Sequence, residues 1–241
     1  MTMICYPMLF CLGVLFEQEV VVGMEKTDTL KVWSTSDFSL DGRGSHPNWA
    51  KADWNTMDQI DPGVTGYASR FKILYSTTGI YVLFQGKDAR ITTRFDEDFA
   101  DLFHGDVFEV FFHPQPTIPL YFEYEINALG NELVLLIPNL DGRQMGWRPW
   151  HYEGNRKVAK RVWVEGGEAV AGGPIESWSA ELFFPFALLQ PLDNVPPGPG
   201  TCWNANFCRL EYDTGTMIKW SWSPIRISFH EFHVYKTITF Q

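Results

Sequence analysis

The sequence predicts an all-β protein, a two-sheet antiparallel β-sandwich with a jelly-roll or immunoglobulin-like arrangement. Short apolar runs rich in Phe, Tyr, Val and Ile recur along the chain, separated by Gly, Pro, Asn and Asp. About ten or eleven such runs occur, whereas the 3.6-residue pattern of an amphipathic helix never extends beyond a few turns. With 241 residues the chain is long enough for one large domain with a substantial core.

The strands follow from these runs and from the turns between them. The clearest hairpin joins 71–76 to 80–87 through Thr-Thr-Gly. A short helical piece is expected within 39–54, where Pro47 suits a first helical turn, and one helical turn at 186–189. The segment 139–155 is expected to be a long irregular loop. The predicted strands are 30–33, 71–76, 80–87, 106–113, 120–127, 132–137, 157–165, 177–184, 202–212, 217–222 and 233–240.

The predicted domain spans 25–241, and residues 1–24 are set apart from it. Their apolar run has the length of the hydrophobic region of a signal peptide, but no basic segment precedes it and no clear cleavage site follows. The run is short for a membrane span. Three interpretations stay open: an atypical signal segment of a secreted or otherwise extracytoplasmic protein, an over-extended start in a cytoplasmic protein that begins at Met24, and a strand.

Composition restricts the partners. A net charge of -10 and a pI near 5.0 argue against nucleic acid and anionic membranes. The aromatic content of 16%, with ten Trp, suits a ligand with apolar faces such as a neutral sugar. The four cysteines show no disulfide framework and no metal pattern. Cys202 and Cys208 flank one predicted strand, roughly 20 Å apart, which is too far for a bond between them.

The densest apolar stretch, 106–127, places three carboxylates among aromatic residues. Glu123 and Glu125 share one face of the second strand of this pair, and Glu109 lies on the first strand. Such groups are costly to bury unless they are paired, hydrogen-bonded or open to a cleft. Two interpretations stay open: a solvated sheet face, and a sheet that lines a polar ligand site.

Two polar segments are candidate sites. The loop 139–155 carries two Arg and two Trp residues, a composition typical of binding loops, although the Trp residues fold back onto the sandwich in the alternative interpretation. The acid-rich segment 88–101 is either a solvated loop or a source of oxygen ligands for a hard cation such as Ca²⁺. The candidate metal ligands are Asp88, Asp96 and Asp98.

Five segments occur in an order that is seen in a known family. They are LDGRGSHPNWAKA, IYVLFQGKD, GDVFEVFFHP with YFEYEIN, SWSAELFFPFALL, and WNANFCRLE followed by SWSP and FHEFHVYKTI. In this order they resemble family 9 carbohydrate-binding modules and their relatives among the DOMON-like β-sandwiches, over 31–240. The resemblance implies a mono-, oligo- or polysaccharide ligand, often with structural calcium, and association with a glycan-degrading enzyme in polysaccharide degradation or uptake.

The resemblance also implies where a sugar binds. Members of the family clamp it between two Trp residues, whose positions fall at Phe103 and near Phe229 here, and a Phe ring can still stack on a pyranose. An Arg that contacts the sugar in some members falls at Glu125. The expected ligand-binding residues are Phe103, Phe229, Trp147, Trp150, Arg143, Arg148, Glu125 and Asn206.

Two other functions compete with non-catalytic sugar binding. No GxSxG, HExxH or phosphate-loop motif is present, but a glycoside hydrolase needs only two carboxyl groups about 5–9 Å apart. Some DOMON-like sandwiches hold haem with Met and His, although C-x-x-C-H is absent here. His230-x-x-His233 is interpreted as structural or ligand-contacting rather than as a zinc site. The carboxylates for hydrolysis are Glu109, Glu123, Glu125 and Glu181, and the haem candidates are Met145, Met217 and the six His.

Overall fold

The computed structural model describes residues 29–61, 66–140 and 143–241. These residues form fourteen β-strands, four 3-10 turns and one short α-helix. The segment 1–24, with its interpretations as a signal, an over-extended start or a strand, lies outside the described residues. Among the helices that the structure describes, none is long and apolar enough to cross a bilayer.

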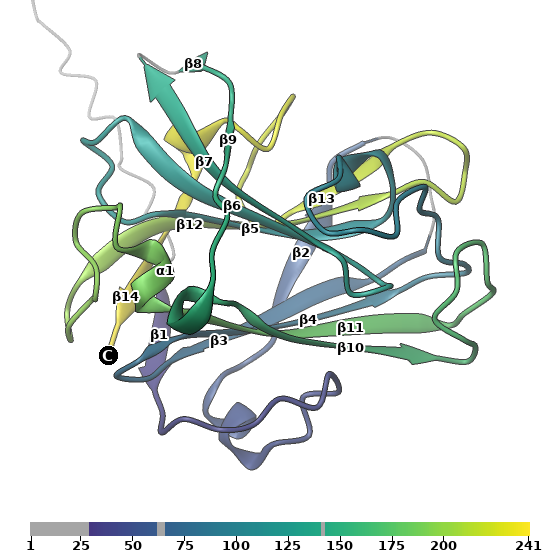
Figure 1. Cartoon of the computed structure of the whole chain (residues 1–241), viewed down its shortest axis with the longest axis horizontal. Coiled ribbons are helices and arrows are strands. Elements are labelled where there is room, and N and C mark those ends of the chain that lie inside the picture. Colours follow the sequence, from purple (N-terminus) through teal and green to yellow (C-terminus); the bar gives the residue numbers. More distant parts are fainter. Residues whose placement is uncertain (1–28, 62–65, 141–142) are drawn as a thin grey trace, which may run out of the picture.

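Most strands lie in two layers that pack face to face (Figure 1). The first layer contains, in order, β14 (Lys236–Phe240), β12 (Cys202–Glu211), β5 (Val107–His113), β6 (Leu120–Asn127) and β7 (Glu132–Leu140). The second contains β10 (Ala159–Glu165), β11 (Ser177–Pro185), β4 (Gly79–Lys87) and β3 (Ser69–Tyr75). Neighbouring strands within each layer are antiparallel. The predicted all-β sandwich is confirmed.

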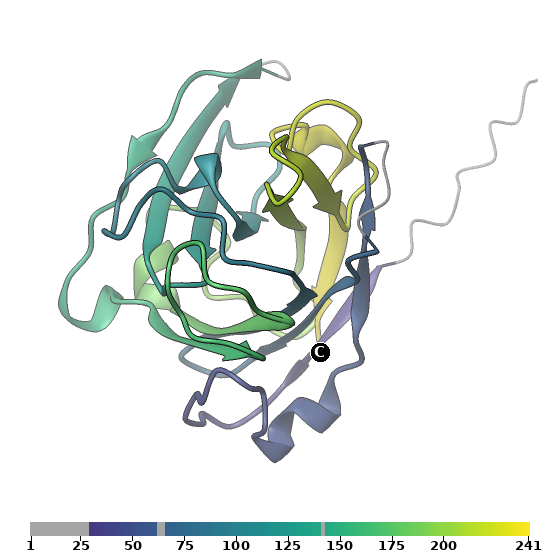
Figure 2. The same cartoon turned by 90° about the vertical axis from the view of Figure 1, so that its right-hand side faces the viewer.

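Two strands join the layers along one side. β1 (Leu30–Ser34) pairs first with β14 and then with β3, and β2 (Asn55–Gln59) bridges β13 (Ile218–Ser221) and β3. Figure 2 shows that the two layers curve toward each other around the core. The pairing of β1 is parallel with both neighbours, a departure from the predicted antiparallel arrangement.

The segment 139–155 is more ordered than predicted. β8 (Arg143–Gln144) and β9 (Arg148–Pro149) each pair with β7. The other short elements are the 3-10 turns η1 (Pro47–Lys51), η2 (Leu102–His104), η3 (Gly154–Arg156) and η4 (Phe232–Val234), and the helix α1 (Phe186–Leu189). The helical pieces expected within 39–54 and at 186–189 are therefore present as η1 and α1.

Aromatic rings fill the space between the layers. Phe71 and Phe207 stack with centroids 3.9 Å apart, and Phe84 and Phe108 with centroids 4.8 Å apart. Five of the ten Trp residues are buried, which assigns much of the aromatic content to packing rather than to a ligand. They are Trp49, Trp178, Trp203, Trp220 and Trp222.

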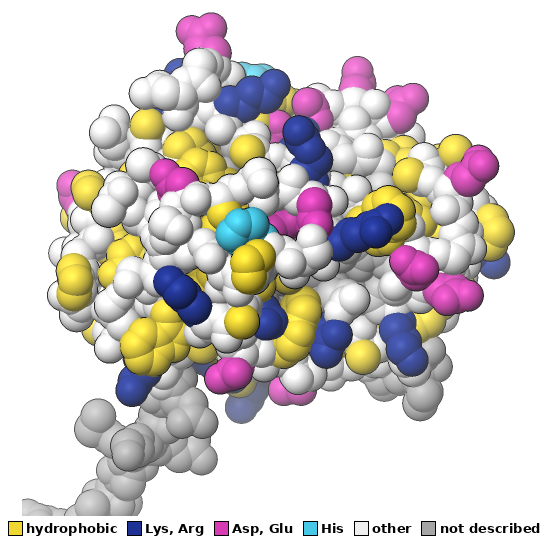
Figure 3. Space-filling model, turned by 90° about the horizontal axis from the view of Figure 1, so that it is seen from below, with side chains coloured by type: hydrophobic (Ala, Val, Ile, Leu, Met, Phe, Trp, Pro, Cys, Tyr) yellow, Lys and Arg dark blue, Asp and Glu magenta, His cyan; other side chains and the backbone are white. Residues whose placement is uncertain are grey.

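A smaller apolar cluster covers the outer face of the second layer. It contains Trp49 of η1 together with Leu74 and Leu83 of the sheet. Figure 3 views the molecule from this side, where hydrophobic, basic and acidic side chains are interspersed. Cys202 begins the first layer's long strand β12 and Cys208 lies within it; both are free thiols, and they do not pair with each other, as their spacing predicted.

Candidate functional site

A cavity of about 290 Å³ opens on the face of β5, β6 and β7 that points away from the second layer. The strand alternation places it there: Phe122, Tyr124 and Ile126 face the core between the layers, so Glu123 and Glu125 face outward. The cavity is lined by Phe103, Glu109, Glu123, Glu125, Leu135, Ile137, Gln144, Trp147, Leu210, Met217, Lys219, Ile227, Ser228, Phe229 and His230.

Three aromatic rings from distant parts of the chain form walls of this cavity. Phe103 lies on η2, Trp147 between β8 and β9, and Phe229 before η4. The Phe103 and Trp147 rings lie 6.4 Å apart at a steep angle. Tyr212 donates its hydroxyl to the Phe103 carbonyl at 2.7 Å, and Tyr235 donates to the Phe229 carbonyl at 2.6 Å. These bonds hold both Phe residues in place before any ligand arrives.

The loop before η4 forms one side of the cavity mouth. The carboxylate of Glu231 accepts backbone N–H bonds from Arg226, Ile227 and Ser228. Burial raises the pKa of Glu231, but these bonds outweigh that effect and keep the pKa below its ordinary value. Ile227 is 80% exposed at this rim, so the mouth presents apolar surface on a loop that its own hydrogen bonds shape.

Three buried carboxyl groups form part of the cavity floor. Glu109 lies directly opposite Glu125 in the β5–β6 ladder, and Glu123 shares the outward face of β6. Burial raises the pKa of Glu109 and Glu125 well above the ordinary value. The neighbouring carboxylates raise both pKa values further. Burial raises the pKa of Glu123 to about 8. The side chains of Glu123 and Glu125 are hydrogen-bonded to each other, and one oxygen of each has no other partner among the described residues. Burial therefore favours the protonated form of all three carboxyls.

His230 lies beside this floor as a neutral group. Its Nδ1 is 3.8 Å from Glu123 Oε2 and 2.8 Å from the Tyr121 hydroxyl, with which it is hydrogen-bonded. Burial lowers the pKa of His230 to about 4, so the imidazole and the protonated Glu123 do not form an ion pair at neutral pH. His233, its partner in the sequence motif, is exposed on η4 and does not line the cavity. The two His residues thus have separate environments.

The structure separates the predicted ligand residues. Phe103, Phe229, Trp147 and Glu125 line one cavity, whereas the remaining four lie elsewhere. Trp150 folds back onto the sandwich core and donates its indole N–H to the Leu188 carbonyl at 3.1 Å. The four that lie elsewhere are Trp150, the exposed Arg143 of β8 and Arg148 of β9, and the fully buried Asn206.

The side chain of Asn206 forms its hydrogen bonds within the protein and does not face the cavity. Its amide bonds to the Ser221 hydroxyl at 2.9 Å and accepts from the Ser223 backbone N–H at 2.8 Å. Sequence reasoning had instead missed several cavity residues on loops and strand ends, notably Gln144, Lys219 and Ser228. No motif marks these positions, although Ser228 immediately precedes Phe229 in the chain.

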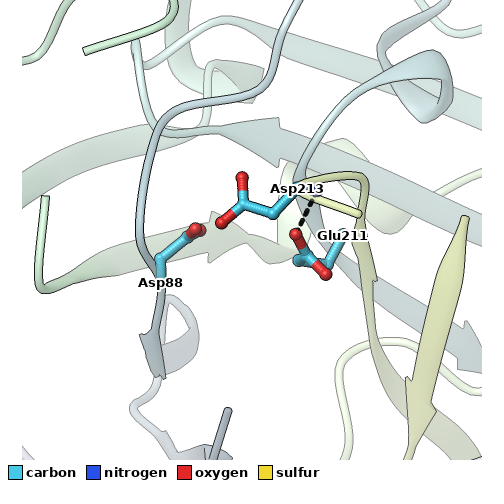
Figure 4. Close-up of side chains that lie close together, drawn as sticks. All are labelled: Asp88, Glu211 and Asp213. Atoms are coloured by element: carbon cyan, nitrogen blue, oxygen red, sulfur yellow. Dashed lines mark hydrogen bonds between the residues drawn. The ribbon is translucent and has the colours of Figure 1, made fainter. Parts of the chain in front are cut away.

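A second group of acids lies where β4 and β12 end, between the two layers. The side chains of Asp88, Glu211 and Asp213 point toward one another (Figure 4), with ligand atoms all within 4.8 Å of one another. Of the predicted metal ligands, only Asp88 belongs to this group. Asp96 is exposed, and Asp98 instead accepts the Glu132 backbone N–H and pairs with Lys160. Of the two partners missed by the sequence, Glu211 ends β12 and Asp213 follows it, both far along the chain from Asp88.

The charge of this acid group is incompletely balanced. Arg209 pairs with Asp88 at 2.9 Å and Arg90 lies 3.8 Å from Asp213, so among the described residues Glu211 is the member of the group without an ion-pair partner. Burial raises the pKa of Asp88 to about 6, Arg209 opposes that rise, and Asp213 adds to it. Glu211 is fully buried, and its Oε2 has no hydrogen-bond partner among the described residues. A divalent cation would satisfy both the charge and this oxygen.

Residues 46–240 match the family model for carbohydrate-binding family 9. The chain belongs to this family. Its motifs predicted this membership, and the match covers every residue that lines the cavity and all three members of the acid group.

Solved structures share the fold of this family 9 module. A candidate carbohydrate-binding protein from Bacteroides uniformis is 19% identical with a TM-score of 0.69, covering 88% of this chain and 99% of its own. A family 9 module from Caldicellulosiruptor kristjanssonii in complex with cellotriose is 13% identical, with a TM-score of 0.60 and coverages of 88% and 93%. The same kind of module with glucose is 12% identical, with a TM-score of 0.59 and coverages of 88% and 95%. A search of curated proteins gave no match.

The four carboxylates considered for hydrolysis do not form one site in this family 9 module. Glu181 lies on β11, in the other layer, where it accepts N–H bonds from Asp41, Gly42 and the Trp49 indole. Of the Met residues considered for haem, Met217 lines the cavity, whereas Met145 is 58% exposed outside it.

The raised pKa values predict a pH dependence of stability for the family 9 module. An unfolded chain releases Glu protons near pH 4–5, whereas folded Glu123 keeps its proton to about pH 8. Between these limits the folded state binds more protons, so the free energy of unfolding falls as pH rises. We expect Glu123→Gln to flatten this fall and to unfold at a higher denaturant concentration than wild type at pH 8. The exposed Glu97→Gln should follow wild type, and equal slopes for all three proteins would contradict the assignment.

Proposed function

We propose that this family 9 module is a non-catalytic carbohydrate-binding domain whose sugar site is the cavity lined by Phe103, Trp147 and Phe229. The observation that carries the proposal is the placement of unpartnered, buried carboxyl oxygens on the floor of an aromatic-walled cavity. A sugar ring has apolar C–H faces and a rim of hydroxyls. The rings therefore stack on its faces, and its hydroxyls supply the hydrogen bonds that the carboxyl groups lack.

The size of the cavity supports a small binding unit. Its volume of about 290 Å³ lies just below the range for small-molecule sites, which is roughly 300–1,000 Å³. We therefore expect one sugar unit to be enclosed, with neighbouring units over the rim at Ile227. Family membership supports a role in glycan degradation or uptake outside the cytoplasm, in association with a glycan-degrading enzyme.

Calorimetric titration with glucose and cellotriose, followed by a glycan array, tests the proposal. We expect saturable binding of at least one glycan and its recovery intact after long incubation. If no glycan binds, the proposal is wrong. If the incubation releases shorter sugars and Glu109→Gln stops this release, hydrolysis replaces non-catalytic binding as the function.

We also propose a structural Ca²⁺ held by Asp88, Glu211 and Asp213. Carboxylate oxygens are the ligands that Ca²⁺ prefers, and the buried, unpartnered Glu211 Oε2 fits that role. The ion would supply positive charge between Asp88, which follows β4 of the second layer, and the two acids at the end of β12 in the first layer. In the protein itself, Arg209 already supplies part of this charge through Asp88.

Removal of calcium is expected to lower the melting temperature. A ligand at one hundred times its dissociation constant stabilises the folded state by about 2.7 kcal/mol, which corresponds to roughly 5–10 °C for a chain of this size. We expect chelator to reverse this shift in wild type and in Asp96→Asn, whose carboxylate is outside the group. Asp213→Asn should not respond to calcium. Identical melting of wild type in calcium and in chelator would argue against the site.

A further inference from the structure

The cavity floor carries acidic groups that no facing cation balances. Glu109 and Glu125 oppose each other across two strands, and Glu123 lies beside them on the same outward face. Their exposed fractions are 2%, 1% and 4%. Asp101 adds a further negative charge that acts on Glu125. Three carboxyls within one small cavity make an acidic floor, which favours a ligand that brings a positive charge.

The cationic side chains of the cavity are committed elsewhere. Lys219 lies 3.4 Å from the Asp61 carboxylate and donates to the Ile227 carbonyl at 3.2 Å. His230 is bonded to the Tyr121 hydroxyl and is neutral at pH 7, because burial lowers its pKa to about 4. The other titratable groups around the floor are uncharged at neutral pH, with burial raising the pKa of each. They are Tyr121, Cys208, Tyr212 and Tyr235.

We propose that the sugar bound in this cavity carries a free amino group, so that the module recognises amino sugars, alone or as the non-acetylated units of a glycan, in preference to neutral glucose. This inference rests on the proposed sugar-binding function and names its ligand class. The ammonium group would face the unpartnered oxygens of Glu123 and Glu125.

Two features favour a sugar-borne ammonium over a bare metal ion. Among the residues that the structure describes, the ligand atoms of these three Glu residues do not converge within 4.8 Å as those of the Asp88 group do. The floor is also walled by Phe103, Trp147 and Phe229, and an ammonium group is attracted to the faces of such rings. The rings at the same time stack on the pyranose that carries the amine.

Binding of an ammonium would be linked to proton release. Burial favours the protonated form of these carboxyls and raises the pKa of Glu123 to about 8, whereas an adjacent cation favours the ionised carboxylate. An amine of this kind stays protonated below about pH 7.7. Between pH 5 and 7 the affinity should therefore rise with pH, because the site must lose a proton that the ligand replaces.

The test compares glucosamine, N-acetylglucosamine and glucose, which differ only at one ring position, by calorimetry with wild-type protein at pH 7. We expect glucosamine to bind at least about tenfold more tightly than the other two, as a desolvated ammonium near carboxylates and rings would. Titrations in two buffers of different ionisation heat should show proton release for glucosamine alone.

Variants assign the effect to the carboxyls. Glu123→Gln and Glu125→Gln keep the shape of the side chain, and each should reduce the preference for glucosamine over glucose to within about threefold, while the exposed Glu97→Gln keeps it. If glucose and glucosamine bind wild type equally well, the amino-sugar inference is overturned and the proposed function stands. If none of the three sugars binds, the amino-sugar inference is overturned, and the proposed function fails with it only if cellotriose and the glycan array also show no binding.

Discussion

Replacing Arg209 by methionine is expected to lower the free energy of unfolding by about 3–5 kcal/mol. The guanidinium is fully buried, pairs with Asp88 at 2.9 Å and donates to the Lys87 carbonyl at 2.6 Å. Its removal leaves Asp88 buried and without an ion-pair partner, close to the buried Asp106. Burial and the charge of Asp88 already raise the pKa of Asp106 to about 8. Loss of one partner of a buried pair costs more than the pair contributes, because the remaining charge has no compensation.

Denaturant unfolding at pH 7 in chelator measures this effect. The matched control is Arg70→Met on β3, because Arg70 is exposed and, among the described residues, donates hydrogen bonds to Gln85 and lies over the Trp54 ring. Its cost should stay within about 0.5 kcal/mol. Adding Asp88→Asn to Arg209→Met should recover part of the loss, which keeps the test informative if the single variant folds poorly. Equal costs for Arg209→Met and Arg70→Met would show that the buried pair is not important for stability.

The double variant Phe103→Ala/Trp147→Ala is expected to weaken sugar binding about thirtyfold. Each ring contributes roughly 1 kcal/mol of stacking, and 1.4 kcal/mol corresponds to a tenfold change in affinity. Trp147 is 54% exposed and Phe103 is partly exposed, so the fold should tolerate both changes. Phe229 is less suitable because it is 7% exposed and packs in a buried cluster.

Calorimetry on the double variant, after its melting temperature has been compared with wild type, measures the loss. Trp33→Ala is the control for removal of an exposed ring, because Trp33 is 45% exposed on β1, outside the cavity. Trp150→Ala separates the two Trp residues of the same loop: it should lower stability, through the lost bond to Leu188, and leave affinity unchanged. If Trp150→Ala abolishes binding and the double variant does not, the sugar site lies at Trp150 rather than in the cavity.

The four predicted aromatic ligand residues show what local sequence patterns can and cannot predict about the site. Phe103 and Phe229 were located by motifs and Trp147 by the composition of its loop, and these three line one cavity. Trp150 has the same chemistry and lies three residues after Trp147, but the pairing of β9 with β7 turns it toward the core, where its backbone N–H bonds to the Val134 carbonyl. No sequence pattern distinguishes the two Trp residues, because strand pairing depends on a partner outside the loop.

The sequence by itself determined the family, the main hairpins and every strand except β2, β8 and β9, because side-chain alternation and turn residues are local properties that act wherever the segment lies. Only the tertiary structure decided which acids meet: Asp88 joins Glu211 and Asp213 rather than Asp96 or Asp98, although these follow it closely in the chain. It likewise decided that Glu109, Glu123 and Glu125 form a buried floor, while Glu181 of the second layer accepts N–H bonds on the outer face of that layer. The physical reason is that burial and charge at a site depend on the packing of segments that are distant in sequence. The hydrophobic periodicity of a segment shows which of its faces is buried, but not which other segments pack against it.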